Sequence, residues 1–87
     1  MTRGLDKRFL DAMRLKLEHG SKMGRTAYEN HWDGSPCDLT FLSKRLSEEV
    51  AELLLTIMKN DPDEILYEAA DVANFAMMIA DLSRPEE

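Results

Sequence analysis

Apolar residues recur at steps of three and four along the second half of the chain. One series comprises Leu39, Leu42, Leu46, Val50, Leu53 and Ile57, and the next comprises Ile65, Ala69, Val72, Phe75, Ala76 and Ile79. This spacing predicts two helices, each with one buried face. The segment Asn60-Asp61-Pro62 between them is typical of a tight turn, so the two helices are expected to fold back on each other as an antiparallel hairpin.

The ends of both helices carry recognisable capping residues. Ser35 is expected to cap the first helix, with Pro36 at the first helical position. Asp61 is expected to cap the second, with Pro62 in the same role, and that helix should continue to about Leu82. The hairpin is therefore predicted over residues 36–83.

An additional helix is predicted near the N-terminus, roughly from Leu5 to His19, with Gly20 as its C-terminal stop. Residues 21–34 lack periodicity and are expected to form a loop. The predicted fold class is therefore all-α, an antiparallel helical hairpin plus an N-terminal helix, in a single domain over residues 1–87.

Two pairs of carboxylates are placed so that they should meet across the hairpin. Glu49 and Glu52 share a face of the first hairpin helix, and Glu68 and Asp71 share a face of the second. At a rise of roughly 1.5 Å per residue, both pairs lie about 12–15 Å from the turn. Four converging acidic groups repel each other strongly, so the pattern predicts a divalent metal site.

The position of these carboxylates on the helical faces strengthens the prediction. Glu68 projects within the apolar stripe of its helix, Asp71 lies at the edge, and Glu49 lies about 20° outside the stripe of the other helix. An ionised carboxylate left unpaired in apolar surroundings costs several kcal/mol, roughly, so these groups need a partner. The alternative interpretation is a solvated acidic hairpin.

Composition excludes several classes of function. The net charge of −6 disfavours binding to a nucleic-acid polymer, and the single cysteine, Cys37, cannot form an internal disulfide. No apolar run resembles a leader peptide or a membrane span, so we expect a cytoplasmic protein. Eighty-seven residues build only a small core, for which oligomerisation is a common remedy.

The pattern E-E-x-x-E, an interval of fifteen residues, and E-x-x-D resembles the metal-binding signature of the MazG-like all-α nucleoside triphosphate pyrophosphohydrolases. The matching segments are Glu48-Glu49-Val50-Ala51-Glu52 and Glu68-Ala69-Ala70-Asp71. The flanking segments 45–47 and 72–74 are also similar to that superfamily. The resemblance covers roughly residues 39–82.

This resemblance implies a Mg²⁺-dependent cleavage of a nucleoside triphosphate into monophosphate and pyrophosphate, as in nucleotide-pool housekeeping. It implies metal ligation by Glu49, Glu52, Glu68 and Asp71, with Glu48 as an accessory ligand or as a base that orients the attacking water. Hard oxygen ligands suit Mg²⁺, with Mn²⁺ as a substitute. Members complete their bundle with a partner subunit, so a homodimer or homotetramer is expected. Relatives often have a further helical segment that closes the nucleotide pocket; here either the partner would supply that wall or the pocket is open.

Three further residues are candidates for substrate binding. Arg45 lies one turn before Glu49 and would contact phosphate or make an ion pair along its helix. Asn74 lies one turn beyond Asp71 and would hydrogen-bond one of the metal-ligating carboxylates or the nucleotide, or else face solvent. Trp32, in the predicted loop, would stack on a base or fill a small core.

Two rival functions remain open on the sequence alone. One is a non-catalytic helical interaction or regulatory module, whose acidic residues are only a charged surface. The other is a di-iron carboxylate bundle, which requires Glu-x-x-His motifs. The two histidines, His19 and His31, lie outside both hairpin helices, so this second rival is disfavoured.

Overall fold

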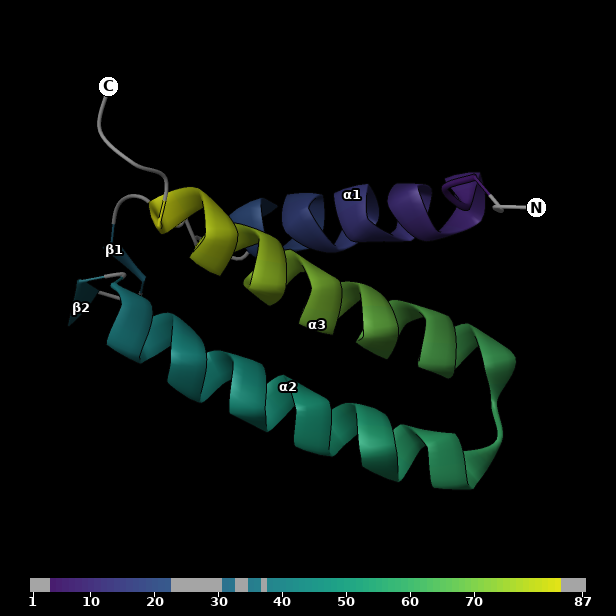
Figure 1. Cartoon of the computed structure of the whole chain (residues 1–87). Coiled ribbons are helices and arrows are strands. Elements are labelled where there is room, and N and C mark those ends of the chain that lie inside the picture. The colour runs from purple at the N-terminus through teal and green to yellow at the C-terminus, as the bar shows by residue number, and fades with distance from the viewer. Residues whose placement is uncertain (1–3, 23–30, 33–34, 37, 84–87) are drawn as a thin grey trace.

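The described residues form three helices, with a pair of two-residue strands between the first and the second (Figure 1). The computed structural model describes residues 4–22, 31–32, 35–36 and 38–83. The helices are α1 (Lys7–Lys22), α2 (Leu39–Lys59) and α3 (Pro62–Leu82). Two residues each form β1 (His31–Trp32) and β2 (Ser35–Pro36), which pair antiparallel with Trp32 opposite Ser35. The predicted all-α fold is confirmed.

The turn between α2 and α3 forms as its residues predict. Asn60 adopts the left-handed conformation with φ of 59°, which asparagine tolerates better than most residues. The carboxylate of Asp61 then accepts hydrogen bonds from the backbone N–H groups of Asp63 and Glu64, and Pro62 occupies the first turn. α2 and α3 consequently run antiparallel as a hairpin (Figure 1).

The predicted start of α2 is wrong by three residues. Asp38, not Ser35, is the N-cap: its carboxylate accepts a hydrogen bond from the backbone N–H of Phe41 at 2.8 Å. An aspartate caps a helix as well as a serine does, and Ser35 and Pro36 are used instead in β2.

The boundaries of α1 also differ from the prediction. α1 begins at Lys7, where the Asp6 carboxylate accepts a hydrogen bond from the N–H of Arg8 at 2.9 Å. It continues through Gly20 to Lys22, because a glycine inside a helix costs only about 1 kcal/mol and does not forbid helix formation. Most of the predicted loop, residues 23–30 and 33–34, lies outside the described residues.

α3 lies between α1 and α2 and packs against both (Figure 1). The buried apolar cluster is formed by Leu42 of α2 with Phe75 and Met78 of α3. Leu46 and Ile79 pack around it while remaining partly accessible. The core therefore lies between α2 and α3, toward the end of the hairpin opposite the turn.

The apolar stripe predicted on α2 is divided between two environments. Leu42 is completely buried and Leu46 and Leu53 are half-buried, but Leu39, Val50 and Ile57 are exposed. The buried face of α2 is rotated about the helix axis relative to the predicted apolar stripe, so that it includes Glu49 and Thr56. The periodicity of the apolar positions was correct, but Leu39, Val50 and Ile57 are not covered by any of the residues that the structure describes.

None of the described helices is long and apolar enough to cross a lipid bilayer.

Candidate metal centre

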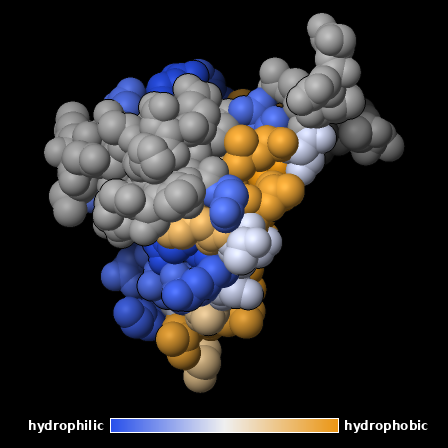
Figure 2. Space-filling model, turned by 90° about the vertical axis from the view of Figure 1, so that its left-hand side faces the viewer, coloured by the Kyte–Doolittle hydropathy of each residue, from blue (hydrophilic) through white to orange (hydrophobic). Residues whose placement is uncertain are grey.

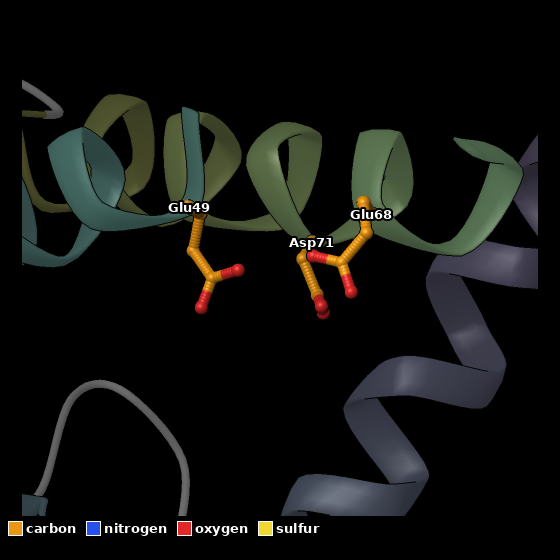
Figure 3. A group of neighbouring side chains, drawn as sticks. All are labelled: Glu49, Glu68 and Asp71. Atoms are coloured by element: carbon orange, nitrogen blue, oxygen red, sulfur yellow. The ribbon is translucent and has the colours of Figure 1, made fainter. Parts of the chain in front are cut away.

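Three carboxylates from two helices converge on one point (Figure 3). Glu49 comes from α2, and Glu68 and Asp71 come from successive turns of α3. One oxygen from each residue lies within 4.8 Å of the other two. Figure 3 shows the three side chains extending to the same side of the hairpin. Three of the four carboxylates predicted to converge are therefore close together, and Glu52 is not in the group.

The cluster is sheltered from water and incompletely paired. Glu49 is only 6% exposed, and Glu68 and Asp71 are half-buried. Glu49 Oε2 and Glu68 Oε2 are buried without a hydrogen-bond partner among the described residues. A buried carboxylate oxygen with no partner carries a desolvation cost that a bound cation would offset.

Two basic side chains partly neutralise the cluster. Lys16 Nζ of α1 lies 3.2 Å from Asp71 Oδ2, and Arg45 Nη2 lies 3.0 Å from Glu49 Oε1. Arg45 also pairs with Glu48 and lies over the Phe75 ring at 5.3 Å from its centroid. Glu68 is left as the member of the three without an ion pair within the described part of the chain.

Burial and mutual repulsion weaken the acidity of all three carboxyl groups. Burial, with the charges of Asp71 and Glu52, raises the pKa of Glu49 to about 7. Burial and the charge of Asp71 raise the pKa of Glu68. Burial also raises the pKa of Asp71, although Lys16 opposes this change. The folded protein therefore resists full ionisation of the site in the absence of a cation.

We expect the metal-free protein to lose stability as the pH rises. The folded-state pKa of Glu49, about 7, lies above its ordinary value of 4.5, so the folded state holds a proton that the unfolded chain has released. The stabilisation is complete below about pH 4.5 and is lost as the pH rises through 7. Thermal unfolding in a chelator between pH 5 and 8 should show a falling Tm. Glu49→Gln should make this decline shallower, whereas a Tm that rises over the interval contradicts the assignment.

Two of the predicted carboxylates lie outside the three-residue cluster. Glu52 is exposed and is not among the grouped ligand atoms, but its charge raises the pKa of Glu49 and Glu68. Glu48 pairs with Arg45, and its side chain is 45% exposed. Both therefore lie beside the cluster, at its solvent side.

The structure bears differently on the predictions made for the three candidate substrate-binding residues. Arg45 makes the ion pair along its helix that was one of its two alternatives. Asn74 does not face solvent, which corrects that alternative: it is 3% exposed, and its Nδ2 donates a hydrogen bond to the backbone oxygen of Met13 at 3.0 Å. The side chain of Trp32 lies outside what the structure describes, so its role stays a prediction.

Sequence reasoning missed Lys16 as a member of the site. It lies on α1, separated from Asp71 by more than fifty residues, and its single charge resembles the other lysines of the N-terminal half. Its position one turn after Ala12, which is buried, was the available signal.

The donor set fits a hard divalent cation. Three equally spaced oxygens bound to one Mg²⁺ at about 2.1 Å lie at most about 3.6 Å apart. The three carboxylate oxygens, which lie within 4.8 Å of one another, therefore need to approach by up to roughly 1.2 Å to share an ion. Among the described residues the group contains carboxylate oxygens alone, which are the ligands that Mg²⁺ and Mn²⁺ prefer. The unpaired oxygens of Glu49 and Glu68 are the atoms available for such an ion.

An all-α hairpin with acidic residues from both helices facing one point defines the class of helical nucleotide pyrophosphohydrolases that the sequence motif resembles. Residues 15–84 match the family model described as phosphoribosyl-ATP pyrophosphohydrolase, and the chain belongs to this family. The family is related to the MazG-like superfamily and supports a hydrolase that acts on phosphoric anhydride bonds. The comparison with curated proteins and the comparison with solved structures each found no match.

Proposed function

We propose that this protein is a divalent-metal-dependent pyrophosphohydrolase that cleaves a nucleotide triphosphate chain between the α and β phosphates and releases pyrophosphate. The observation that carries this proposal is the group formed by the buried Glu49 and the half-buried Glu68 and Asp71, in which two carboxylate oxygens have no hydrogen-bond partner among the described residues. The family membership supports the reaction class. Mg²⁺ is the proposed ion, with Mn²⁺ as a substitute.

In this proposal, charged side chains of α2 and α3 hold the metal ion, the water and the phosphate chain. Glu49, Glu68 and Asp71 would hold the ion, with Glu52 beside them. When bound, the ion neutralises phosphate charge and lowers the pKa of a coordinated water. Glu48, at the exposed edge, would orient the attacking water and accept its proton; at present it is paired with Arg45. Arg45, which lies over Phe75 and is paired with Glu49, would contact a phosphate oxygen.

The proposed substrate class is defined by a triphosphate chain, which both candidate kinds of substrate contain. A simple nucleoside triphosphate and phosphoribosyl-ATP, the compound named in the family description, carry the same triphosphate chain. Either would present the same anhydride bond to the cluster. Phosphoribosyl-ATP is the first substrate to test, and ordinary (deoxy)nucleoside triphosphates are the second.

A substrate panel with pyrophosphate detection tests this proposal. We expect pyrophosphate release from at least one of phosphoribosyl-ATP, the ribonucleoside triphosphates and the deoxynucleoside triphosphates, including dUTP, in millimolar Mg²⁺. Millimolar Mg²⁺ or Mn²⁺ should also raise the Tm, because an ion that binds only the folded state stabilises it. If the protein shows no turnover and its Tm does not respond to the metal ions, the non-catalytic interaction module is supported instead.

We also propose that the protein associates with a second copy of itself. The exposed residues of the α2 stripe include Val50 and Ile57, and the exposed apolar residues Leu54 and Met58 adjoin them on the same side of the helix. Hydrophobic surface is visible at the lower edge of Figure 2, the level that α2 occupies in Figure 1. A contiguous apolar helical face is typical of a helix that packs against another helix.

Association should depend on this face of α2. Leu54→Lys, at a residue that is 59% exposed, should shift the protein toward the monomer in light scattering at micromolar concentration. Leu15→Lys is the control, because Leu15 is similarly exposed but belongs to α1. A wild-type protein that is monomeric at these concentrations contradicts the proposal.

A further inference from the structure

Lys16 is held where α1 passes the acidic cluster. Its Nζ lies 3.2 Å from Asp71 Oδ2, and the two side chains are only 28% and 21% exposed. Lys7, on the same helix, pairs with Asp11 at 3.1 Å but is 90% exposed. Lys16 is thus a sheltered cation paired with one of the residues that would hold the metal ion.

The same lysine lines a pocket between α1 and α3. The cavity has a volume of about 330 Å³ and is lined by Leu15, Lys16, Glu18, His19 and Tyr67. Tyr67 immediately precedes Glu68, so the pocket adjoins the cluster. Figure 3 shows α1 beside the part of α3 that carries Glu68. Lys16 therefore belongs both to the acidic cluster and to the neighbouring cavity.

Electrostatic repulsion disfavours the simultaneous binding of Lys16 and a divalent cation to Asp71. A dication on Asp71 repels the ammonium group at this short distance and reduces its attraction to the carboxylate. Burial limits screening by water, so the ammonium gains most from another anion nearby. A triphosphate chain bound at the cluster would supply that anion, with several negative charges at the same place.

We propose that Lys16 is a substrate-binding residue that exchanges Asp71 for the phosphate chain when the site is loaded, and that the α1–α3 pocket holds the part of the nucleotide beyond that chain. This inference rests on the proposed function and adds to it a phosphate contact and a subsite. The lining suits a nucleotide. Leu15 and the Tyr67 ring offer apolar surface for a base, and Glu18 and His19 offer polar groups for sugar hydroxyls.

The exchange predicts opposite effects on metal binding and on phosphate binding. Lys16→Gln removes a cation that competes for Asp71, so Mn²⁺ alone should bind about threefold or more tightly in calorimetry. The same variant loses a phosphate contact. Inorganic tripolyphosphate, measured in saturating Mn²⁺, should therefore bind roughly tenfold more weakly, equivalent to about 1.4 kcal/mol. The KM for the nucleotide found in the substrate panel should rise to a similar extent.

Two further variants complete the test. Lys7→Gln removes a lysine–aspartate ion pair from the same helix and should leave Mn²⁺ and tripolyphosphate affinity unchanged. Tyr67→Ala removes a wall of the pocket but no charge. It should raise the KM for the nucleotide about tenfold while leaving tripolyphosphate affinity unchanged, which separates the subsite from the phosphate contact.

The outcomes also separate this inference from the proposed function. A wild-type protein that binds Mn²⁺ and releases pyrophosphate, with a Lys16→Gln variant that binds Mn²⁺ more weakly or tripolyphosphate equally well, overturns the role of Lys16 alone. An unchanged KM in Tyr67→Ala overturns the subsite. A wild-type protein that does not bind Mn²⁺ overturns both the inference and the proposed function.

Discussion

Glu68→Gln should abolish metal binding and turnover together while leaving the metal-free protein as stable as before or slightly more stable. Glu68 is a half-buried member of the cluster, and its Oε2 has no hydrogen-bond partner among the described residues. Burial and the charge of Asp71 raise its pKa, so its ionised form is disfavoured in the absence of a cation. Glutamine keeps the shape of the side chain and removes one negative ligand.

The measurements are pyrophosphate release, Mn²⁺ affinity and the Tm in a chelator. We expect a loss of turnover of about a hundredfold or more, because both the ion and its orientation are disturbed. Asp63→Asn is the control on the same helix. Asp63 lies in the exposed first turn, so its loss should leave turnover almost unchanged and cost at most about 1 kcal/mol of stability. Full activity and metal response in Glu68→Gln would show that the acidic cluster is not the active site.

Leu42→Ala should produce the largest loss of stability. Leu42 is completely buried and forms the core cluster with Phe75 and Met78. Truncation of a buried leucine costs about 2–5 kcal/mol, from lost burial and from the cavity that remains. In a domain of this size, roughly 1 kcal/mol corresponds to 4–8 °C in Tm, so we expect a decrease of about 10 °C or more.

A matched truncation on the same helix provides the control. Leu55 is 63% exposed, so Leu55→Ala should change the Tm by only a few degrees, roughly. Thermal unfolding followed by circular dichroism measures both variants. Equal Tm values for the two variants would contradict the placement of the core between α2 and α3.

Local patterns in the sequence were sufficient for the hairpin and for its acidic pairs. The capping role of Asp61, the turn at Asn60 and the lengths of α2 and α3 depend on neighbouring residues, whose preferences can be read along the chain. The distances from the turn then placed Glu49 at a height similar to that of Glu68 and Asp71, and helical periodicity placed them on neighbouring faces of the two helices. The start of α2 was misplaced because Ser35 and Asp38 are both competent caps, and the sequence contains no signal that ranks them.

The tertiary structure alone decided what α1 contributes and which half of the α2 stripe is buried. Lys16 and Met13 reach Asp71 and Asn74 through contacts between residues more than fifty positions apart, and no local pattern encodes such a contact. On α2, the apolar stripe is wide enough to be buried in more than one rotation. The choice that buries Leu42 and exposes Val50 depends on how the helix packs against α3. The sequence by itself therefore determined the helices, the hairpin and the placement of its acidic residues, whereas long-range packing determined the basic partners of the cluster and which apolar residues of α2 are left exposed.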